Sequence, residues 1–301
     1  MGSFPIPCLW LISMAAITHL LSKRRSCLGV DLLLFGPATL VLTRRVYDAI
    51  FDLSSLSGWE AMHAMHLDAF QLLAWGVAFY LLGRLSPGRA PNRYEIAGAI
   101  MVCLIGAFSS AAGLAALSLY LFAMAAGDGR QHAVATVFAA LFGQQAVVPL
   151  IYGLVVDKLT RFDAMLVGTA VKLSDAGATW QGNIIALPSG HAIQILEACC
   201  SFHNVSMAVL SWVAVTKLER PQWRPGDIAV LAAAAGCQVL MNAVRIYLMA
   251  QSFDMYDYWH NGAGARIYSV SASAAAVLIV AYGAHLVSRG AANRAMVASL
   301  A

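Results

Sequence analysis

The sequence predicts an all-α polytopic membrane protein, with about eight to nine transmembrane helices and a small external hairpin before the helix that carries a pair of cysteines. Of the 301 residues, 60% are hydrophobic and only 11% are charged, whereas soluble domains usually carry about 25% charged residues. Apolar stretches near the roughly 20 residues that a spanning helix needs recur along the chain. No tail or linker is long enough for a separate soluble domain, so residues 1–301 are predicted to form a single membrane domain.

Nine apolar stretches are candidate spans, of which the second is short and the fourth and fifth are poorly separated. They cover residues 5–22, 27–43, 62–83, 95–110, 111–127, 132–155, 195–216, 227–250 and 264–287. The first stretch follows almost no basic residues and runs into Lys23-Arg24-Arg25, which is the reverse of the order in a cleavable secretory signal. We therefore expect it to be retained as a helix.

The basic residues predict the orientation of these spans, because lysine and arginine concentrate in cytoplasmic loops. One arrangement places twelve of the nineteen inside: Lys23, Arg24, Arg25, Arg84, Arg89, Arg93, Arg130, Lys217, Arg220, Arg224, Arg289 and Arg294. Arg44, Arg45, Lys158, Arg161 and Lys172 then fall in outer loops. The N-terminus is predicted outside and the C-terminus inside. The start of the 195–216 helix and the end of the 227–250 helix then meet at the external face.

Residues 157–195 are the one long stretch that does not resemble a span. Its first part, from Asp163 to Val171, mixes apolar and polar residues and suits a helix lying at the membrane interface. Its second part has two short apolar runs around Pro188-Ser189-Gly190, a turn sequence in which Pro presets φ and Gly reaches positive φ. We predict a small hairpin on the outer surface, with an irregular loop as the alternative.

Two adjacent cysteines, Cys199 and Cys200, follow the hairpin. If the next helix begins near Leu196, Cys199 lies in its first turn, where the positive end of the helix dipole favours thiolate over thiol. Both cysteines can also be small packing residues. The six cysteines of the chain lie in apolar segments without the spacing of zinc ligands, so we predict no metal, no other cofactor and no disulfide framework.

Arg245 lies about six residues, roughly 9 Å, inside the outer end of an apolar helix. A permanent charge there is costly unless it is solvated or paired. Its guanidinium could donate hydrogen bonds to the oxyanion that forms when a thiolate attacks a carbonyl. Snorkelling to the outer headgroups is the alternative interpretation.

His260 follows the same helix. Near neutral pH, an imidazole can take a proton from a thiol and return it to a leaving amine. The alternative is an ordinary interfacial histidine beside Tyr258 and Trp259. The expected placement of Cys199, Arg245 and His260 at one face favours a shared site.

Four sequence elements, in order and spacing, resemble the exosortase/archaeosortase family of membrane cysteine transpeptidases. They are Gly182-Asn183-Ile-Ile-x-Leu187-Pro188-x-Gly190, Glu197-Ala198-Cys199, Asn242-Ala-x-Arg245-Ile and His260-x-x-x-Gly264. The resemblance covers residues 145–290, which would form the catalytic core. Residues 1–144 are similar only as a set of N-terminal membrane helices.

The resemblance implies that Cys199 is the nucleophile, Arg245 stabilises the oxyanion or the substrate, and His260 is the general acid and base. Asn242 and Cys200 are possible auxiliary residues. Members of the family cleave a C-terminal sorting signal of secreted proteins, made of a short motif, a membrane helix and a basic tail. Cleavage takes place on the outer side of the membrane, here expected to be the bacterial inner membrane. By analogy with sortases, the acyl-enzyme passes to an amine acceptor. The implied partners are these secreted proteins and membrane lipid, with no nucleic acid.

The chain departs from the family pattern directly after the nucleophile. The family commonly continues Ser-Gly-Ile-Arg, where this sequence has Cys200-Ser201-Phe202-His203. The difference bears on the substrate motif more than on the reaction type. His203 lies four residues after Cys199, on the same face of a helix, and is an alternative base to His260.

Interpretations from other functional classes stay open. A transporter or binding protein without proteolytic activity would explain the many helices and one buried arginine, but it predicts repeat-related broken helices, which we do not find in the sequence. A membrane metalloenzyme could use His63 and His66, whose spacing suits two ligands, but no further ligand is placed near them. A catalytically inactive scaffold with the same fold is the third alternative.

Overall fold

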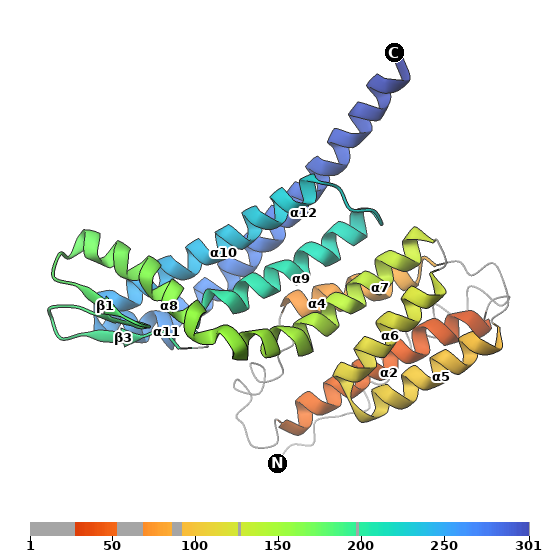
Figure 1. The fold of residues 1–301 in the computed structure, drawn as a ribbon, viewed down its shortest axis with the longest axis horizontal. Helices are drawn as coiled ribbons and strands as arrows, with labels where there is room; N and C mark the ends of the chain where they lie inside the picture. Colours follow the sequence, from red (N-terminus) through yellow and green to blue (C-terminus); the bar gives the residue numbers. More distant parts are fainter. Residues whose placement is uncertain (1–27, 53–68, 86–91, 126–127, 197–198, 301) are drawn as a thin grey trace.

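The computed structural model describes residues 28–52, 69–85, 92–125, 128–196 and 199–300. These residues form helices and one small sheet (Figure 1), so the predicted all-α membrane fold is confirmed. Among them, three helical runs are long and apolar enough to cross a membrane: Gly129–Ser174, Gly226–Gln251 and Ala263–Gly290. The predicted span 5–22 lies outside the described residues.

In the part of the chain that the structure describes, the first section of the bundle has five helices. They are α2 (Leu28–Asp52), α4 (Ala69–Leu82), α5 (Arg93–Phe108), α6 (Ser110–Met124) and α7 (Gly129–Phe142). Ser109 separates α5 from α6, because it ends the first helix and its side chain accepts a hydrogen bond from the backbone of Ala112 in the second. The predicted break between two helices in this region is therefore confirmed.

Helix α2 extends beyond the predicted span of 27–43. Arg44 and Arg45, which we expected in a loop, lie within the helix. The Nη1 of Arg44 donates to the carbonyl of Ala107 near the end of α5, at 3.2 Å. This bond gives the Arg44 guanidinium a partner on a neighbouring helix.

The next part of the chain differs from the prediction. Helix α7 continues through a π-helical turn, η1 (Gly143–Val147), into α8 (Val148–Ser174). The expected end at residue 155 and the separate interfacial helix at 163–171 are therefore wrong, because both belong to one helical run. Its charged residues Asp157, Lys158 and Arg161 occupy an exposed face. The run is not straight (Figure 1), and η1 is a place where its regular hydrogen-bond pattern changes.

A three-stranded antiparallel sheet follows α8. It contains β1 (Thr179–Gln181), β2 (Ile184–Ala186) and β3 (Ala192–Gln194), paired in that order. The predicted hairpin corresponds to β2 and β3 and is confirmed, whereas β1 was not predicted. Gly182 and Gly190 have φ angles of 62° and 84°. Because L side chains rarely adopt these angles, both turns need glycine.

One face of the sheet packs against helices. Ile185 and Ile193 face each other across β2 and β3, and both are buried with residues of α8 and of the following helices. Trp180 of β1 lies against Gly168 of α8, where a Cβ would come within 2.8 Å of the indole ring. These contacts fix the sheet at one end of the bundle.

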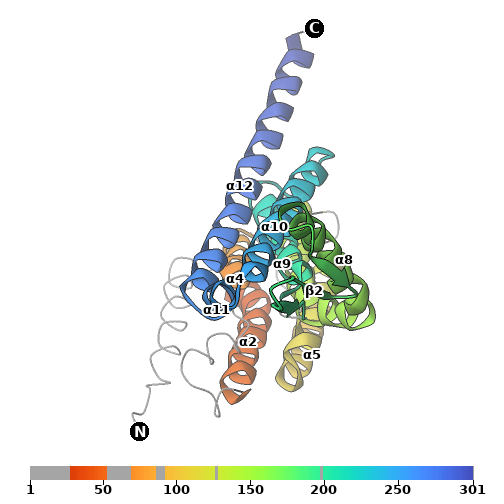
Figure 2. The same ribbon diagram turned by 90° about the vertical axis from the view of Figure 1, so that its left-hand side faces the viewer.

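The last part of the chain consists of α9 (Ser201–Glu219), α10 (Gly226–Gln251), the short α11 (Phe253–His260) and α12 (Ala263–Leu300). Helices α9, α10 and α12 pack against one another, and the C-terminal part of α12 extends beyond the bundle (Figures 1 and 2). The buried Gln238 of α10 donates to the carbonyl of Ala272 in α12 at 2.8 Å. Helix α11 was not predicted.

The turn between α9 and α10 is fastened to α12. Arg220 forms a buried ion pair with Asp227 and also donates to the Ala284 carbonyl at 3.0 Å. Arg224 donates to the Val287 carbonyl at 3.0 Å. We call this arrangement the arginine clamp; it lies at the end of α9 and α10 opposite to the sheet (Figure 1).

Candidate active site

Cys199 lies in a turn before α9, not in its first helical turn. The helix begins at Ser201, and the backbone N–H of Cys199 donates to the Leu196 carbonyl at 3.0 Å. The expected helix start near Leu196 is therefore wrong. The observed start is fixed by Asp163 of α8, whose carboxylate accepts from the backbone N–H and the hydroxyl of Ser201, both at 2.7 Å. A carboxylate at this end of a helix is also favoured by the helix dipole.

The Cys199 thiol is set in a buried cluster between the sheet and α10. Its side chain is 7% exposed and lies in the same cluster as Ile246 and Met249. Burial raises the pKa of the Cys199 thiol above its usual value, and the charge of Arg245 offsets only part of that rise. The charge that favours a thiolate is therefore that of Arg245, in addition to any effect of the α9 dipole.

Cys200 faces different surroundings. It is the residue that precedes α9, and its thiol lies beside Asp163 and Tyr152 of α8. Burial and the neighbouring carboxylate raise the pKa of Cys200 to about 11. Although neither cysteine is inside the helix, as we expected both to be, their environments distinguish them: only Cys199 is influenced by a cation.

Asn242 connects the backbone of Cys199 to α12. Its amide Nδ2 donates to the Cys199 carbonyl at 2.8 Å, and its Oδ1 accepts from the Tyr268 hydroxyl at 3.2 Å. The same hydroxyl accepts from Nδ2 of Asn204 in α9 at 2.9 Å. Both Asn242 and Tyr268 are buried. The network thus joins α9, α10 and α12 around the turn that carries the cysteine.

Arg245 lies one helical turn after Asn242 and is held by α11 and α12. Its Nε donates to the carbonyl of Trp259 at 3.0 Å. Its guanidinium carbon lies 4.8 Å from the centroid of the Tyr268 ring, a cation–π geometry. The side chain is half-buried. These contacts direct the guanidinium toward neighbouring helices. They also give its charge partners, which reduces the cost of placing a charge within an apolar helix.

His260 is the last residue of α11 and directly follows the residue that binds Arg245. Its ring stacks on Tyr256, with centroids 4.9 Å apart, and its Nδ1 lies 2.9 Å from Oδ1 of Asn261. None of the hydrogen bonds found among the described residues joins this imidazole to Cys199 or Arg245. Gly264 lets α11 pack closely on α12, because a Cβ there would come within 2.7 Å of the Tyr258 ring.

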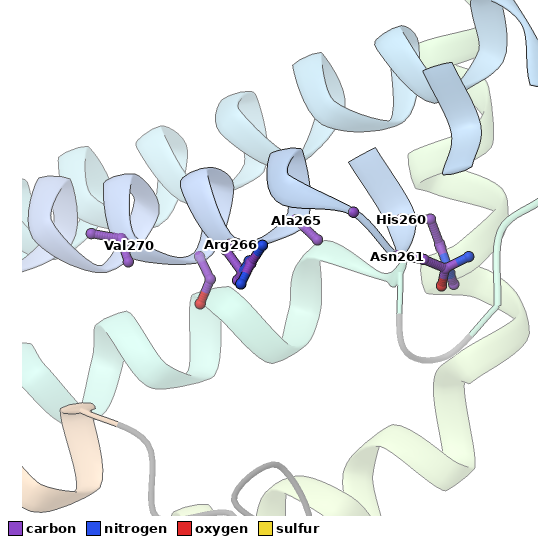
Figure 3. A pocket seen from close by; sticks show the side chains of 7 residues that line it. His260, Asn261, Ala265, Arg266 and Val270 are labelled. Atoms are coloured by element: carbon purple, nitrogen blue, oxygen red, sulfur yellow. The ribbon is translucent and has the colours of Figure 1, made fainter. Parts of the chain in front are cut away.

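A cavity of about 670 Å³ opens beside His260. His260 and Asn261 reach it from the end of α11, whereas Arg266 and Val270 come from the first turns of α12 (Figure 3). The remaining lining residues are Gly262, Ala265 and Ser269. A group that enters this cavity would meet the imidazole and a second guanidinium.

His203 does not have the relation to Cys199 that its spacing suggested. It lies on α9 with an exposed side chain, but Cys199 precedes that helix. The argument from a shared helix face is therefore wrong. Elsewhere in the described part of the chain, no three His, Cys, Asp or Glu side chains are grouped so that they could hold a metal ion. His63 and His66 lie outside the described residues.

Three residues of this region were missed by the sequence analysis: Asp163, Asn204 and Tyr268. Asp163 had a detectable signal, because it shares the buried face of α8 with Val167 and Val171. A carboxylate on such a face requires a hydrogen-bond partner. Asn204 and Tyr268 carry no comparable signal, since their importance depends on the contact between α9 and α12.

A family model described as transmembrane exosortase matches residues 51–279. The match includes the cysteine, the arginine and the histidine discussed above, and it extends further toward the N-terminus than the sequence motifs do. Comparisons with curated proteins and with solved structures found no match. Because the family model covers most of the chain, this protein belongs to the transmembrane exosortase family.

Proposed function

We propose that the protein is a membrane cysteine protease or transpeptidase that uses Cys199 as its nucleophile. The observation that carries the proposal is a buried thiol whose backbone is bound by Asn242, one helical turn before an arginine that is held by two other helices, at the end of the bundle where α11 presents His260. Arg245 favours the thiolate, which is the reactive form. Membership of the exosortase family supports the same reaction class.

In the proposed reaction, the Cys199 thiol gives its proton to His260 and the thiolate attacks a peptide carbonyl. The carbon–sulfur bond forms as the carbonyl π electrons move to oxygen, and the guanidinium of Arg245 stabilises the oxyanion. Collapse of this intermediate breaks the carbon–nitrogen bond, and His260 returns the proton to the leaving amine. An acceptor amine or water then attacks the thioester and releases Cys199.

The proposed substrates are secreted proteins that end in a short motif, a membrane helix and a basic tail. A membrane-embedded enzyme suits such a substrate, because the scissile bond would lie beside the substrate's own helix. The basic tail would remain on the cytoplasmic side, so the proposed site acts on the external face. In a bacterium with two membranes, the enzyme would reside in the inner one.

The decisive experiment compares the two cysteines. We expect Cys199→Ala and Cys199→Ser to abolish processing of a coexpressed tail-bearing substrate, while protein level and membrane insertion persist. Cys200→Ala is the matched control and should retain at least partial activity, because its thiol has no cation beside it. Processing is read from the mass of the substrate. Wild-type processing by Cys199→Ala would refute the protease proposal.

A further inference from the structure

We propose that Tyr268 is the positioning residue of the site: its ring places the guanidinium of Arg245, and its hydroxyl, through Asn242, places the backbone of Cys199. The inference rests on the proposed role of Cys199. It concerns one buried side chain that contacts two separate parts of the machinery, and no sequence motif described above contains it.

The ring of Tyr268 limits where the guanidinium can lie. Arg245 has two identified anchors, its Nε bond to Trp259 and the face of the Tyr268 ring. The first anchor uses Nε and leaves both terminal nitrogens of the fork able to donate elsewhere. The ring attracts the cation without taking a hydrogen bond from it. Tyr268 therefore holds the charge in place while keeping the donors available for an oxyanion.

The hydroxyl of Tyr268 acts on the other side of the site. It donates to Oδ1 of Asn242 and accepts from Nδ2 of Asn204, so its proton direction is set. An Asn242 amide with its oxygen bound to Tyr268 must point its NH₂ group away, and that group donates to the Cys199 carbonyl. The hydroxyl thereby fixes which way the amide faces. With the amide reversed, two carbonyl oxygens would face each other at Cys199.

Alkylation of Cys199 tests both proposed roles of Tyr268, that of its ring and that of its hydroxyl, without any substrate. The full-length protein, with Cys8, Cys27, Cys103, Cys200 and Cys237 replaced by alanine, is labelled with iodoacetamide across a pH series. The midpoint of the profile reports the charge beside the thiol, and the limiting rate at high pH reports access to the thiolate. Because no processing is measured, failure of the protease proposal would not affect this result.

The ring is tested by a pair of substitutions. Tyr268→Leu should raise the midpoint by on the order of half a pH unit, because the guanidinium is no longer held near the thiol. Tyr268→Phe keeps the ring and should leave the midpoint at the wild-type value. Tyr282→Leu, at an exposed tyrosine of the same helix, is the control and should change nothing. Equal midpoints for Tyr268→Leu and the wild type would overturn the proposed role of the ring.

The hydroxyl is tested by a double-mutant cycle. Tyr268→Phe and Asn242→Ala should each raise the limiting alkylation rate by about fivefold, the size expected for loss of one buried hydrogen bond. Together they should give little more than either alone, since both release the same carbonyl. Additive effects, or an unchanged limiting rate in Tyr268→Phe, would overturn the proposed role of the hydroxyl. Tyr268→Phe removes one oxygen atom, so this arm does not depend on whether the leucine variant folds.

Discussion

At the scale of single residues, the proposed chemistry depends on one thiol, and the burial and the charged neighbour of this thiol shift its pKa in opposite directions. Burial raises the pKa of Cys199 and so disfavours its thiolate, and the positive charge of Arg245 offsets part of that rise. Cys200 is buried without such a cation and lies beside a carboxylate. The difference between adjacent cysteines therefore arises from the helices they face, which no local sequence pattern reveals.

Substitutions of Arg245 separate its charge from its shape. Arg245→Lys keeps a positive charge but loses the planar fork, so we expect processing to fall by at least about 100-fold, as for a lost oxyanion donor. Arg245→Ala removes the charge as well. The pKa of Cys199 should then rise further, and the midpoint of its alkylation profile should move to higher pH. A lysine variant with full processing would contradict the oxyanion role.

The two candidate bases are distinguished by a second pair of substitutions. We expect His260→Ala to abolish processing, because His260 ends α11 beside the arginine-binding carbonyl of Trp259. His203→Ala should have a mild effect, since its side chain is exposed on α9. Single-turnover processing across a pH series provides the measurement. The opposite ranking would transfer the role of the base to α9.

At the scale of elements, close packing between α11 and α12 places His260. Gly264 is the contact point, and a methyl group there would meet the ring of Tyr258 at 2.7 Å. We expect Gly264→Ala to push α11 away from α12 and lower processing by about tenfold or more, because small displacements of reacting groups are costly. Gly290→Ala, at an open position of the same helix, is the control and should process normally.

The elements also show how far sequence reasoning reaches. The β2–β3 hairpin was predictable because Pro188 and Gly190 specify a turn locally. The break at Ser109 was visible as well. The true start of α9 was not, because it depends on a contact between Asp163 and Ser201, which are 38 residues apart. The length of α8 was missed because charged residues on its exposed face resembled a loop.

The candidate site was predictable to a similar degree. A thiol, a guanidinium and an imidazole suggested the proposed chemistry of Cys199, Arg245 and His260. The antiparallel arrangement of α9 and α10 suggested that these three residues share one end of the bundle. The network through Asn204 and Tyr268 requires three helices to be in place before any of its bonds exists. Sequence spacing carries no information about such contacts.

At the scale of the whole molecule, the orientation in the membrane can be tested at two exposed positions. Ser189 lies in the β2–β3 turn and Gln222 in the turn between α9 and α10. In a background without native cysteines, we expect Ser189→Cys to react with a membrane-impermeant maleimide from outside the cell. Gln222→Cys should react only after permeabilisation. The reverse labelling would place the site on the wrong side for the proposed secreted substrates.

The arginine clamp couples the orientation of α12 in the membrane to that of α9 and α10. Hydrogen bonds near 3.0 Å cannot bridge a bilayer, so the α9–α10 turn and residues 284–287 of α12 must occupy the same face. A chain with only α12 inverted would leave Arg220 and Arg224 without these acceptors. Partial inversion of this half of the protein is therefore penalised by the loss of these bonds. A reporter attached after α12 would also show which face of the membrane the α9–α10 turn occupies.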